Sequence, residues 1–161
     1  MYYGIKVMTK KYNKFLSATA DFDLENSPYY WVTQVHAQYV QNVDHVLKKY
    51  GLDNSRRRIL LALKAKHQAS VSDLSEMIIC KMSTTTKIVY RLKDEGLVST
   101  YNCADDARIT RVLLTDKGQQ MIQKINDLSH IVLEQSFEGL TPLQIEKMLA
   151  NLKQIFKNLA R

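Results

Sequence analysis

The sequence predicts a mainly α-helical domain with one small β-hairpin. Apolar side chains recur at intervals of three and four residues along six segments, which is the spacing of amphipathic helices. Two short β-prone runs, 97–101 and 109–114, flank the turn-rich segment 102–108, which is the pattern of a hairpin. The chain has 161 residues and a hydrophobic share of 45%, which suits one domain with appended helices.

The first two helices are predicted from the residues at their ends. Ser27-Pro28 begins the first helix because proline suits the first helical turn, and Gly51 ends it. Asp53 is the expected N-cap of a second helix that runs to Lys66. The inner face of this second helix carries Ile59, Leu60 and Leu63.

A short helix, a tight turn and a further helix follow. Ser70 and Asp73 form the expected capping pair of the short helix, and a break at 80–82 separates it from the next one. Ser83 is predicted to cap that next helix, and Gly96 follows its last turn. Two helices joined in this way, the second with a polar and cationic outer face, form a helix-turn-helix. With the hairpin as a wing, the predicted fold is a winged helix-turn-helix.

Two long helices complete the predicted fold. Thr115 is the expected N-cap of the fifth helix. The run Thr141-Pro-Leu-Gln144 is expected to begin the sixth helix, with Thr141 as the N-cap, proline at the first helical position, and Gln144 at the third position, where its side chain can bond back to the N-cap. The sixth helix carries an apolar stripe of Ile145, Leu149, Leu152, Phe156 and Leu159. This stripe is larger than one small core needs. It is therefore expected to pair with a second copy, the alternative being that it folds back on its own subunit.

Positive charge gathers in the middle of the chain. The formal net charge is +7 and the pI is about 9.4. Between Arg56 and Arg111, eleven lysines and arginines outnumber six acidic residues, so this third of the chain carries +5 of the total. A concentrated positive field favours a polyanionic partner.

The order of elements and one motif resemble the MarR family of bacterial regulators. The motif is Arg91-Leu-Lys-Asp-Glu-Gly-Leu-Val98, followed by Asp106-Ala-Arg108 and Leu114-Thr-Asp-Lys-Gly118. The resemblance covers 28–160, and it implies a DNA-binding lobe over 52–114 with dimerisation helices over 28–51 and 115–160. Residues 1–27 form an N-terminal extension, and 21–31 are similar to the leader of family members that control aromatic-acid catabolism.

The second helix of the helix-turn-helix is expected to enter the major groove of double-stranded DNA. Its N-terminal and outward residues would face base edges or phosphates: Ser83, Thr84, Thr86, Lys87, Tyr90 and Arg91. Arg108 at the wing tip suits the narrow minor groove, Asp106 is expected to orient Arg108 and stabilise the turn, and Arg111 is a second phosphate contact. The alternative is an ordinary solvated helix face.

The resemblance also implies a homodimer and an effector pocket. The first, fifth and sixth helices would form the dimer, so that two recognition helices lie about one DNA turn (~34 Å) apart over a pseudo-palindromic operator. The candidate pocket lining is Trp31, His36, Tyr39 and Arg56. Arg56 shares the face of Ile59 and Leu60, where its cation would pair with the carboxylate of a small aromatic acid. The alternative is that the rings are core and Arg56 pairs with a structural acid.

These expectations describe a dimeric transcription repressor that a small aromatic acid releases from DNA, without a cofactor or a metal. Two alternatives stay open: a DNA-binding regulator without an effector, and a winged helix used for contact between proteins. An enzyme is not expected, because the chain has no Gly-rich phosphate loop, HExxH or GxSxG. The apolar runs are too short to span a membrane and no secretory signal is present, so the expected location is the cytoplasm, at the nucleoid.

Overall fold

The computed structural model describes residue 15, residues 23–103, residue 106 and residues 108–160. The chain divides into two compact units, Met1–Asn42 and Val43–Arg161. Most of the predicted N-terminal extension, 1–27, lies outside the described residues. None of the described helices is both long enough and apolar enough to cross a membrane.

The first unit holds a short 3-10 helix and most of helix α1. The 3-10 helix, Leu24–Asn26, begins after Asp23, whose side chain accepts a hydrogen bond from the Glu25 N–H. Helix α1, Pro28–Leu47, begins at the predicted proline and continues into the second unit. There a second 3-10 helix, Lys48–Tyr50, is followed by Gly51, so the predicted end of the first helix is confirmed to within one turn.

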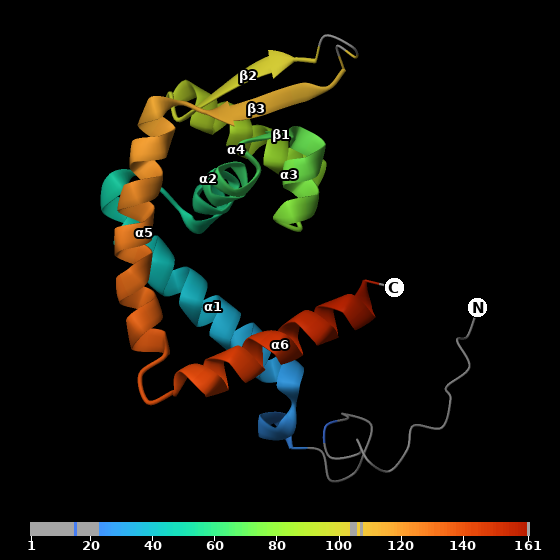
Figure 1. The fold of residues 1–161 in the computed structure, drawn as a ribbon, viewed down its shortest axis with the longest axis vertical. Helices are drawn as coiled ribbons and strands as arrows, with labels where there is room; N and C mark the ends of the chain where they lie inside the picture. Colours follow the sequence, from blue (N-terminus) through green and yellow to red (C-terminus); the bar gives the residue numbers. More distant parts are fainter. Residues whose placement is uncertain (1–14, 16–22, 104–105, 107, 161) are drawn as a thin grey trace, which may run out of the picture. The chain divides into compact units, whose positions relative to one another are not determined.

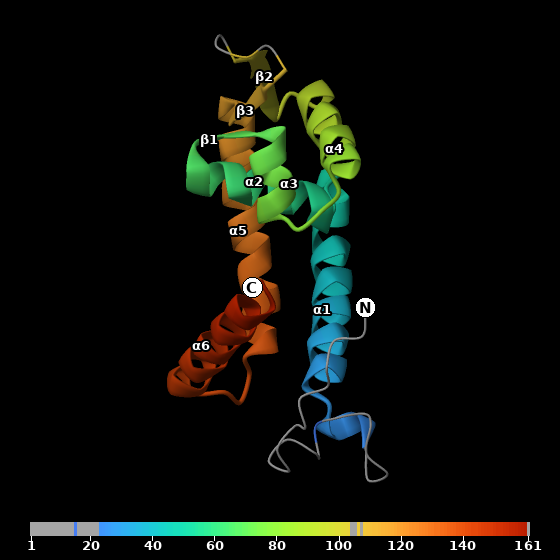
Figure 2. The same ribbon diagram turned by 90° about the vertical axis from the view of Figure 1, so that its right-hand side faces the viewer.

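The second unit is a lobe of three helices and a small sheet, followed by two long helices (Figures 1 and 2). Its elements are α2 Asn54–Lys66, β1 Gln68–Ser70, α3 Val71–Met77, α4 Met82–Asp94, β2 Val98–Asn102, β3 Thr110–Leu114, α5 Asp116–Ser136 and α6 Pro142–Leu159. Helix α5 begins beside the sheet and runs away from it, and α6 begins at the far end of α5 (Figure 1). The predicted mainly α-helical fold with a hairpin wing is confirmed.

The sheet is antiparallel with the strand order β1-β3-β2. In the hairpin Val98 lies opposite Leu114 and Asn102 opposite Thr110, so each strand begins one residue later than predicted. On the other edge of β3, Ser70 lies opposite Arg111. The sequence did not predict β1, because a strand of three residues is too short to show an alternating pattern.

The core of the second unit is formed by apolar side chains from the end of α1, from α2, α3, α4 and α5, and from β3. Its most deeply buried members include Val43, Leu47, Ile59, Leu60, Leu63, Leu74, Val89, Leu92, Val112 and Ile125. Burial of one such side chain contributes about 1.5–3 kcal/mol. This core holds α4 against α2 and α3, and it therefore determines which face of α4 remains outside.

Four of the five predicted helix caps are confirmed. The side chains of Asp53, Ser70, Thr115 and Thr141 each accept a hydrogen bond from a backbone N–H in the first turn of their helix. The prediction for Ser83 is wrong. The N-cap is Lys81, two residues earlier, and α4 begins at Met82, because Lys81 is the extended residue whose carbonyl oxygen accepts from the N–H groups of both Thr84 and Thr85.

The start of α5 is joined closely to the end of α4. The Thr115 hydroxyl donates to the Gly96 carbonyl oxygen at 2.7 Å and accepts from the Gly118 N–H at 3.1 Å, while the Thr115 N–H donates to the Leu97 carbonyl oxygen at 3.2 Å. A Cβ atom on Gly118 would lie only 2.1 Å from that Leu97 oxygen. The motif Leu114-Thr-Asp-Lys-Gly118 thus provides a cap and a close backbone contact at the base of the wing.

Candidate nucleic-acid interface

Helix α4 presents one apolar face to the core and one polar face to solvent. Thr85, Val89 and Leu92 are buried on the inner face. The residues predicted for DNA lie elsewhere on the helix: Ser83, Thr84, Lys87, Tyr90 and Arg91 are exposed, and Thr86 is half-buried. In the run of three threonines, Thr85 therefore faces the core, whereas Thr84 and Thr86 lie toward solvent. The outer face of α4 is thus accessible to a partner.

The start of α4 leaves hydrogen-bonding groups available. Its N-cap is Lys81, whose side chain makes no capping hydrogen bond. The first N–H groups of the helix therefore have no hydrogen-bond acceptor in the N-cap side chain. The Thr86 hydroxyl donates to the Met82 carbonyl oxygen at 2.9 Å. With its hydrogen used in this way, Thr86 retains a methyl group and acceptor lone pairs for a base edge.

The described part of the wing tip carries an ion pair. Arg108 donates to Asp106 from its backbone N–H at 3.0 Å, from Nε at 3.0 Å and from Nη2 at 2.9 Å. The Arg108 side chain is nevertheless 90% exposed. These hydrogen bonds hold the pKa of the Asp106 carboxyl below its ordinary value, so at neutral pH it is ionised. The contacts orient the guanidinium and leave it accessible to solvent.

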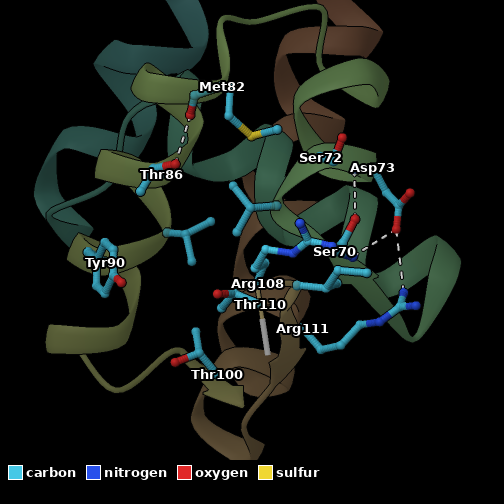
Figure 3. A pocket seen from close by; sticks show the side chains of 13 residues that line it. Ser70, Ser72, Asp73, Met82, Thr86, Tyr90, Thr100, Arg108, Thr110 and Arg111 are labelled. Atoms are coloured by element: carbon cyan, nitrogen blue, oxygen red, sulfur yellow. Dashed lines mark hydrogen bonds and ion pairs between the residues drawn. The ribbon is translucent and has the colours of Figure 1, made fainter. Parts of the chain in front are cut away.

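A groove of about 620 Å³ separates α4 from the wing. Figure 3 shows Met82, Thr86 and Tyr90 of α4 along one side, Ser72 and Asp73 of α3 on the other, and Arg108, Thr110 and Thr100 of the hairpin between them. Among the predicted contact residues, Thr86 and Tyr90 of the helix and Arg108 and Arg111 of the hairpin thus line one groove.

Arg111, predicted as a phosphate contact, lies beside the capping box of α3. Its Nη1 atom is 3.6 Å from Asp73 Oδ2, and its side chain is one-third exposed. Asp73 accepts from the Ser70 N–H at 2.8 Å, and its own N–H donates to the Ser70 hydroxyl at 3.0 Å. The Ser70 hydrogen bonds, with smaller contributions from the charges of Arg111 and Lys66, hold the pKa of Asp73 below its ordinary 3.8.

We expect Asp73→Ala to lower the free energy of unfolding by about 1 kcal/mol at pH 7, since it removes a capping acceptor. Because the pKa of Asp73 is lower in the folded state, this contribution is complete above the unfolded pKa and is lost as the pH falls through the folded value. Thermal unfolding of both proteins between pH 7 and 3 should therefore show their difference shrinking below about pH 4. Glu76→Ala, on the exposed face of the same helix, should show no such convergence; a constant difference for Asp73→Ala would contradict the prediction.

Three consecutive arginines, which contribute to the positive charge of the lobe, make internal contacts. Arg56 is buried and pairs with Asp53 and Glu95, Arg57 Nε donates to the Ser129 hydroxyl, and Arg58 donates to the Ile78 carbonyl oxygen. The exposed cations of α4 are Lys87, Arg91 and Lys93, and the described part of the wing adds Arg108. The exposed positive charge therefore comes from fewer residues than the sequence count, and three of these four cations, Lys87, Arg91 and Arg108, are predicted contact residues.

The predicted effector residues fall in different units. Trp31, His36 and Tyr39 lie on the part of α1 that belongs to the first unit, and Arg56 lies in the second. The Trp31 indole N–H donates to the Glu25 carbonyl oxygen at 2.8 Å, and its ring meets Tyr30 edge to face. Arg56 pairs with two carboxylates of the protein, as expected if this arginine has a structural role and does not bind an effector. An effector site formed by these residues stays a prediction.

Glu95 stands in the motif that begins at Arg91, but the sequence assigned no role to it. Its carboxylate lies 2.5 Å from Arg56 Nη1 and 3.4 Å from Arg91 Nε, and its carbonyl oxygen accepts from Lys117 Nζ at 2.7 Å. The spacing of four residues between Arg91 and Glu95 was a local signal for the longer of these ion pairs. The ion pair between Arg56 and Glu95 has no local signal in the sequence, because its partners are far apart along the chain. Within the described residues, no group of three or more histidine, cysteine or acidic side chains is placed to hold a metal ion.

Comparison with known proteins gives relatives in sequence and proteins of similar structure. The chain is 39% identical over 142 residues to the HTH-type transcriptional repressor IacR of Pseudomonas putida, covering 88% of this chain and 85% of the relative. A MarR-family regulator from Silicibacter pomeroyi has a similar fold, with a TM-score of 0.78 and 24% identity over 87% of this chain and 94% of that one. The structure of Bordetella bronchiseptica BpsR is also similar, with a TM-score of 0.73 and 18% identity over 79% of this chain and 96% of that one. The DNA binding of BpsR is regulated by 6-hydroxynicotinic acid. No protein-family model matches the chain.

The fold, the exposed face of α4 and the close relative together define a winged helix-turn-helix regulator of transcription that binds DNA, and not an enzyme. Within that class the relationship is specific, because the similarity to IacR covers 88% of this chain and 85% of the relative. The chain belongs to the MarR family.

Proposed function

We propose that the protein binds a pseudo-palindromic operator as a homodimer and represses transcription until a small aromatic carboxylate releases it. The observation that carries the DNA-binding part is the groove that Thr86 and Tyr90 of α4 line together with Arg108 of the wing. The repressor assignment follows the function of IacR, and the aromatic acid follows the regulation of BpsR.

The groove suits a strand of duplex DNA. In the proposed complex α4 occupies the major groove, which is about 12 Å wide and accepts a helix. Arg108 enters the adjacent minor groove, where the negative potential attracts arginine. The sugar–phosphate backbone between the two grooves then passes between α4 and the wing, next to Thr110 and Arg111. This arrangement uses every predicted contact residue of the hairpin.

Helix α6 supports the homodimer. None of its residues is buried, although it carries a stripe of apolar side chains. The exposed members are Met148, Leu149, Leu152, Ile155, Phe156 and Leu159. A contiguous apolar surface of this kind on a soluble protein is typical of an interface. The same stripe in a second copy supplies the matching surface that a two-fold interface requires.

The effector part of the proposal has a thermodynamic condition. A ligand weakens DNA binding only if it binds more tightly to a dimer whose recognition helices are wrongly spaced for the operator. Trp31, His36 and Tyr39 offer rings and a polar group, and Arg56 offers a cation. Because Arg56 already contacts two carboxylates, an acid that binds there must compete with Asp53 or Glu95.

The proposal is tested with a duplex that the wild-type protein selects from a random library. Fluorescence anisotropy should show two chains on each selected duplex, and the logarithm of the affinity should fall linearly with the logarithm of the salt concentration. Addition of 6-hydroxynicotinate or benzoate should weaken binding. Failure to select any sequence would contradict operator binding, and one chain per duplex would contradict the dimer. Unchanged affinity at saturating acid would leave a regulator without this class of effector.

A further inference from the structure

We propose that two arginines of α2, Arg56 and Arg58, are positioning residues that hold the recognition helix α4 at its two ends. We call this pair the arginine clamp. The inference rests on the proposed placement of α4 in the major groove, and it concerns what fixes the direction of that helix. Both side chains extend from one turn of α2, yet their partners lie on opposite sides of α4 in the sequence.

Arg56 contacts the end of α4. Its Nη1 atom donates to Glu95 Oε1 at 2.5 Å, and its Nε atom donates to Asp53 Oδ2 at 3.1 Å. Glu95 is the C-cap of α4, and its backbone N–H donates to the Arg91 carbonyl oxygen. The Arg56 side chain is only 6% exposed. A buried guanidinium is costly without its carboxylate partners, so this contact is maintained in the folded protein.

Arg58 contacts the turn that precedes α4. Its Nη2 atom donates to the carbonyl oxygen of Ile78, the C-cap of α3. The next residue, Ile79, has a positive φ of 49°, a conformation that a β-branched residue rarely adopts. The hydrogen bond from Arg58 fixes the carbonyl next to this reversal of the chain, and so it fixes where α4 begins.

Helix α2 is itself anchored, which makes it a suitable base for the clamp. The Asn54 N–H donates to Asp44 Oδ1 at 2.5 Å, and Arg57 Nε donates to the Ser129 hydroxyl of α5 at 3.1 Å. The direction of α4 relative to α5 therefore depends on contacts that pass through three consecutive arginines. Contacts to base edges need an accurate helix direction, whereas phosphate attraction depends mainly on charge. The clamp should thus affect sequence-specific binding more than binding to arbitrary DNA.

The test compares Glu95→Gln with Asp94→Asn. Both variants remove one negative charge at the end of α4, but Asp94 is exposed and has no place in the clamp. Affinity is measured for the duplex selected by the wild-type protein and for a scrambled duplex of equal length. For Glu95→Gln we expect at least about a tenfold loss on the selected duplex, in the range of one mismatched base pair. Its affinity for the scrambled duplex should be unchanged or higher, because Arg91 is released. Asp94→Asn should keep the wild-type ratio between the two duplexes.

An equal change on both duplexes for Glu95→Gln, or a ratio equal to that of Asp94→Asn, would overturn the clamp. If Glu95→Gln does not fold, the double variant Arg56→Met, Glu95→Met replaces it, since apolar replacement of a buried ion pair is often tolerated. A folded double variant with the wild-type ratio would likewise overturn the inference. A wild-type protein that does not distinguish the two duplexes contradicts the proposed function itself.

Discussion

Replacing Gly118 by alanine is expected to prevent stable folding of the second unit. The new Cβ atom would lie 2.1 Å from the Leu97 carbonyl oxygen and 3.1 Å from the Leu97 carbonyl carbon. These are backbone atoms at the junction of α4 and β2, so no side-chain rotation relieves the overlap. Relief requires α5 to move away from the wing, which breaks the hydrogen bonds of Thr115 to Gly96 and Leu97. We expect a loss of more than about 4 kcal/mol, which approaches the whole stability of a domain at the lower end of the usual range of about 5–15 kcal/mol.

Urea unfolding followed by circular dichroism measures this effect, and Gly139→Ala is its matched control. Gly139 has a φ of +80°, but no atom lies within 4 Å of the position that its Cβ would occupy. Its replacement costs only the strain of a left-handed residue, about 1–2 kcal/mol. A Gly118→Ala protein as stable as Gly139→Ala would contradict the close approach of α5 to Leu97.

The helix ends show how far local sequence determines this fold. Asp53, Ser70, Thr115 and Thr141 cap their helices as predicted, because a cap needs only a side-chain acceptor and an N–H group three residues away. Ser83 has the same chemistry and is not a cap. Buried Thr85, Val89 and Leu92 set the start of α4 through packing against the core, and that packing outweighs one local hydrogen bond.

The candidate site divides along the same line. The exposed face of α4 and the Asp106–Arg108 pair follow from a helical period and a two-residue spacing, and both could be predicted. The roles of Arg56 and Arg57 could not, because Glu95 and Ser129 are 39 and 72 residues away along the chain. A charge count treats these arginines as part of the surface field. Only the tertiary fold shows that they neutralise or bind internal partners.

Arg108→Ala should weaken binding to the selected duplex by about 1–3 kcal/mol, or roughly 5- to 150-fold, while the protein remains folded. The side chain is 90% exposed and its partner within the described residues is Asp106, so its removal leaves no buried group unpaired. The slope of log affinity against log salt should decrease by about one unit, the contribution of one phosphate contact. Arg108→Lys keeps the charge and should restore the slope but only part of the affinity, since an ammonium lacks the planar fork.

Asp106→Ala distinguishes two effects of the Asp106 carboxylate on DNA affinity, which have opposite signs: orientation of the Arg108 guanidinium and repulsion of phosphates. If the carboxylate merely repelled phosphates, its removal would strengthen DNA binding. The Arg108 guanidinium donates two hydrogen bonds to Asp106, which reduce the freedom that it must lose on entering the minor groove. We therefore expect Asp106→Ala to bind the selected duplex more weakly than wild type although it carries one more net positive charge. In a protein that already carries Arg108→Ala there is no guanidinium to orient, so Asp106→Ala should only remove repulsion and strengthen DNA binding.

A double-mutant cycle on affinities from fluorescence anisotropy measures this change of sign. Tighter binding by the single Asp106→Ala variant would contradict the orienting role.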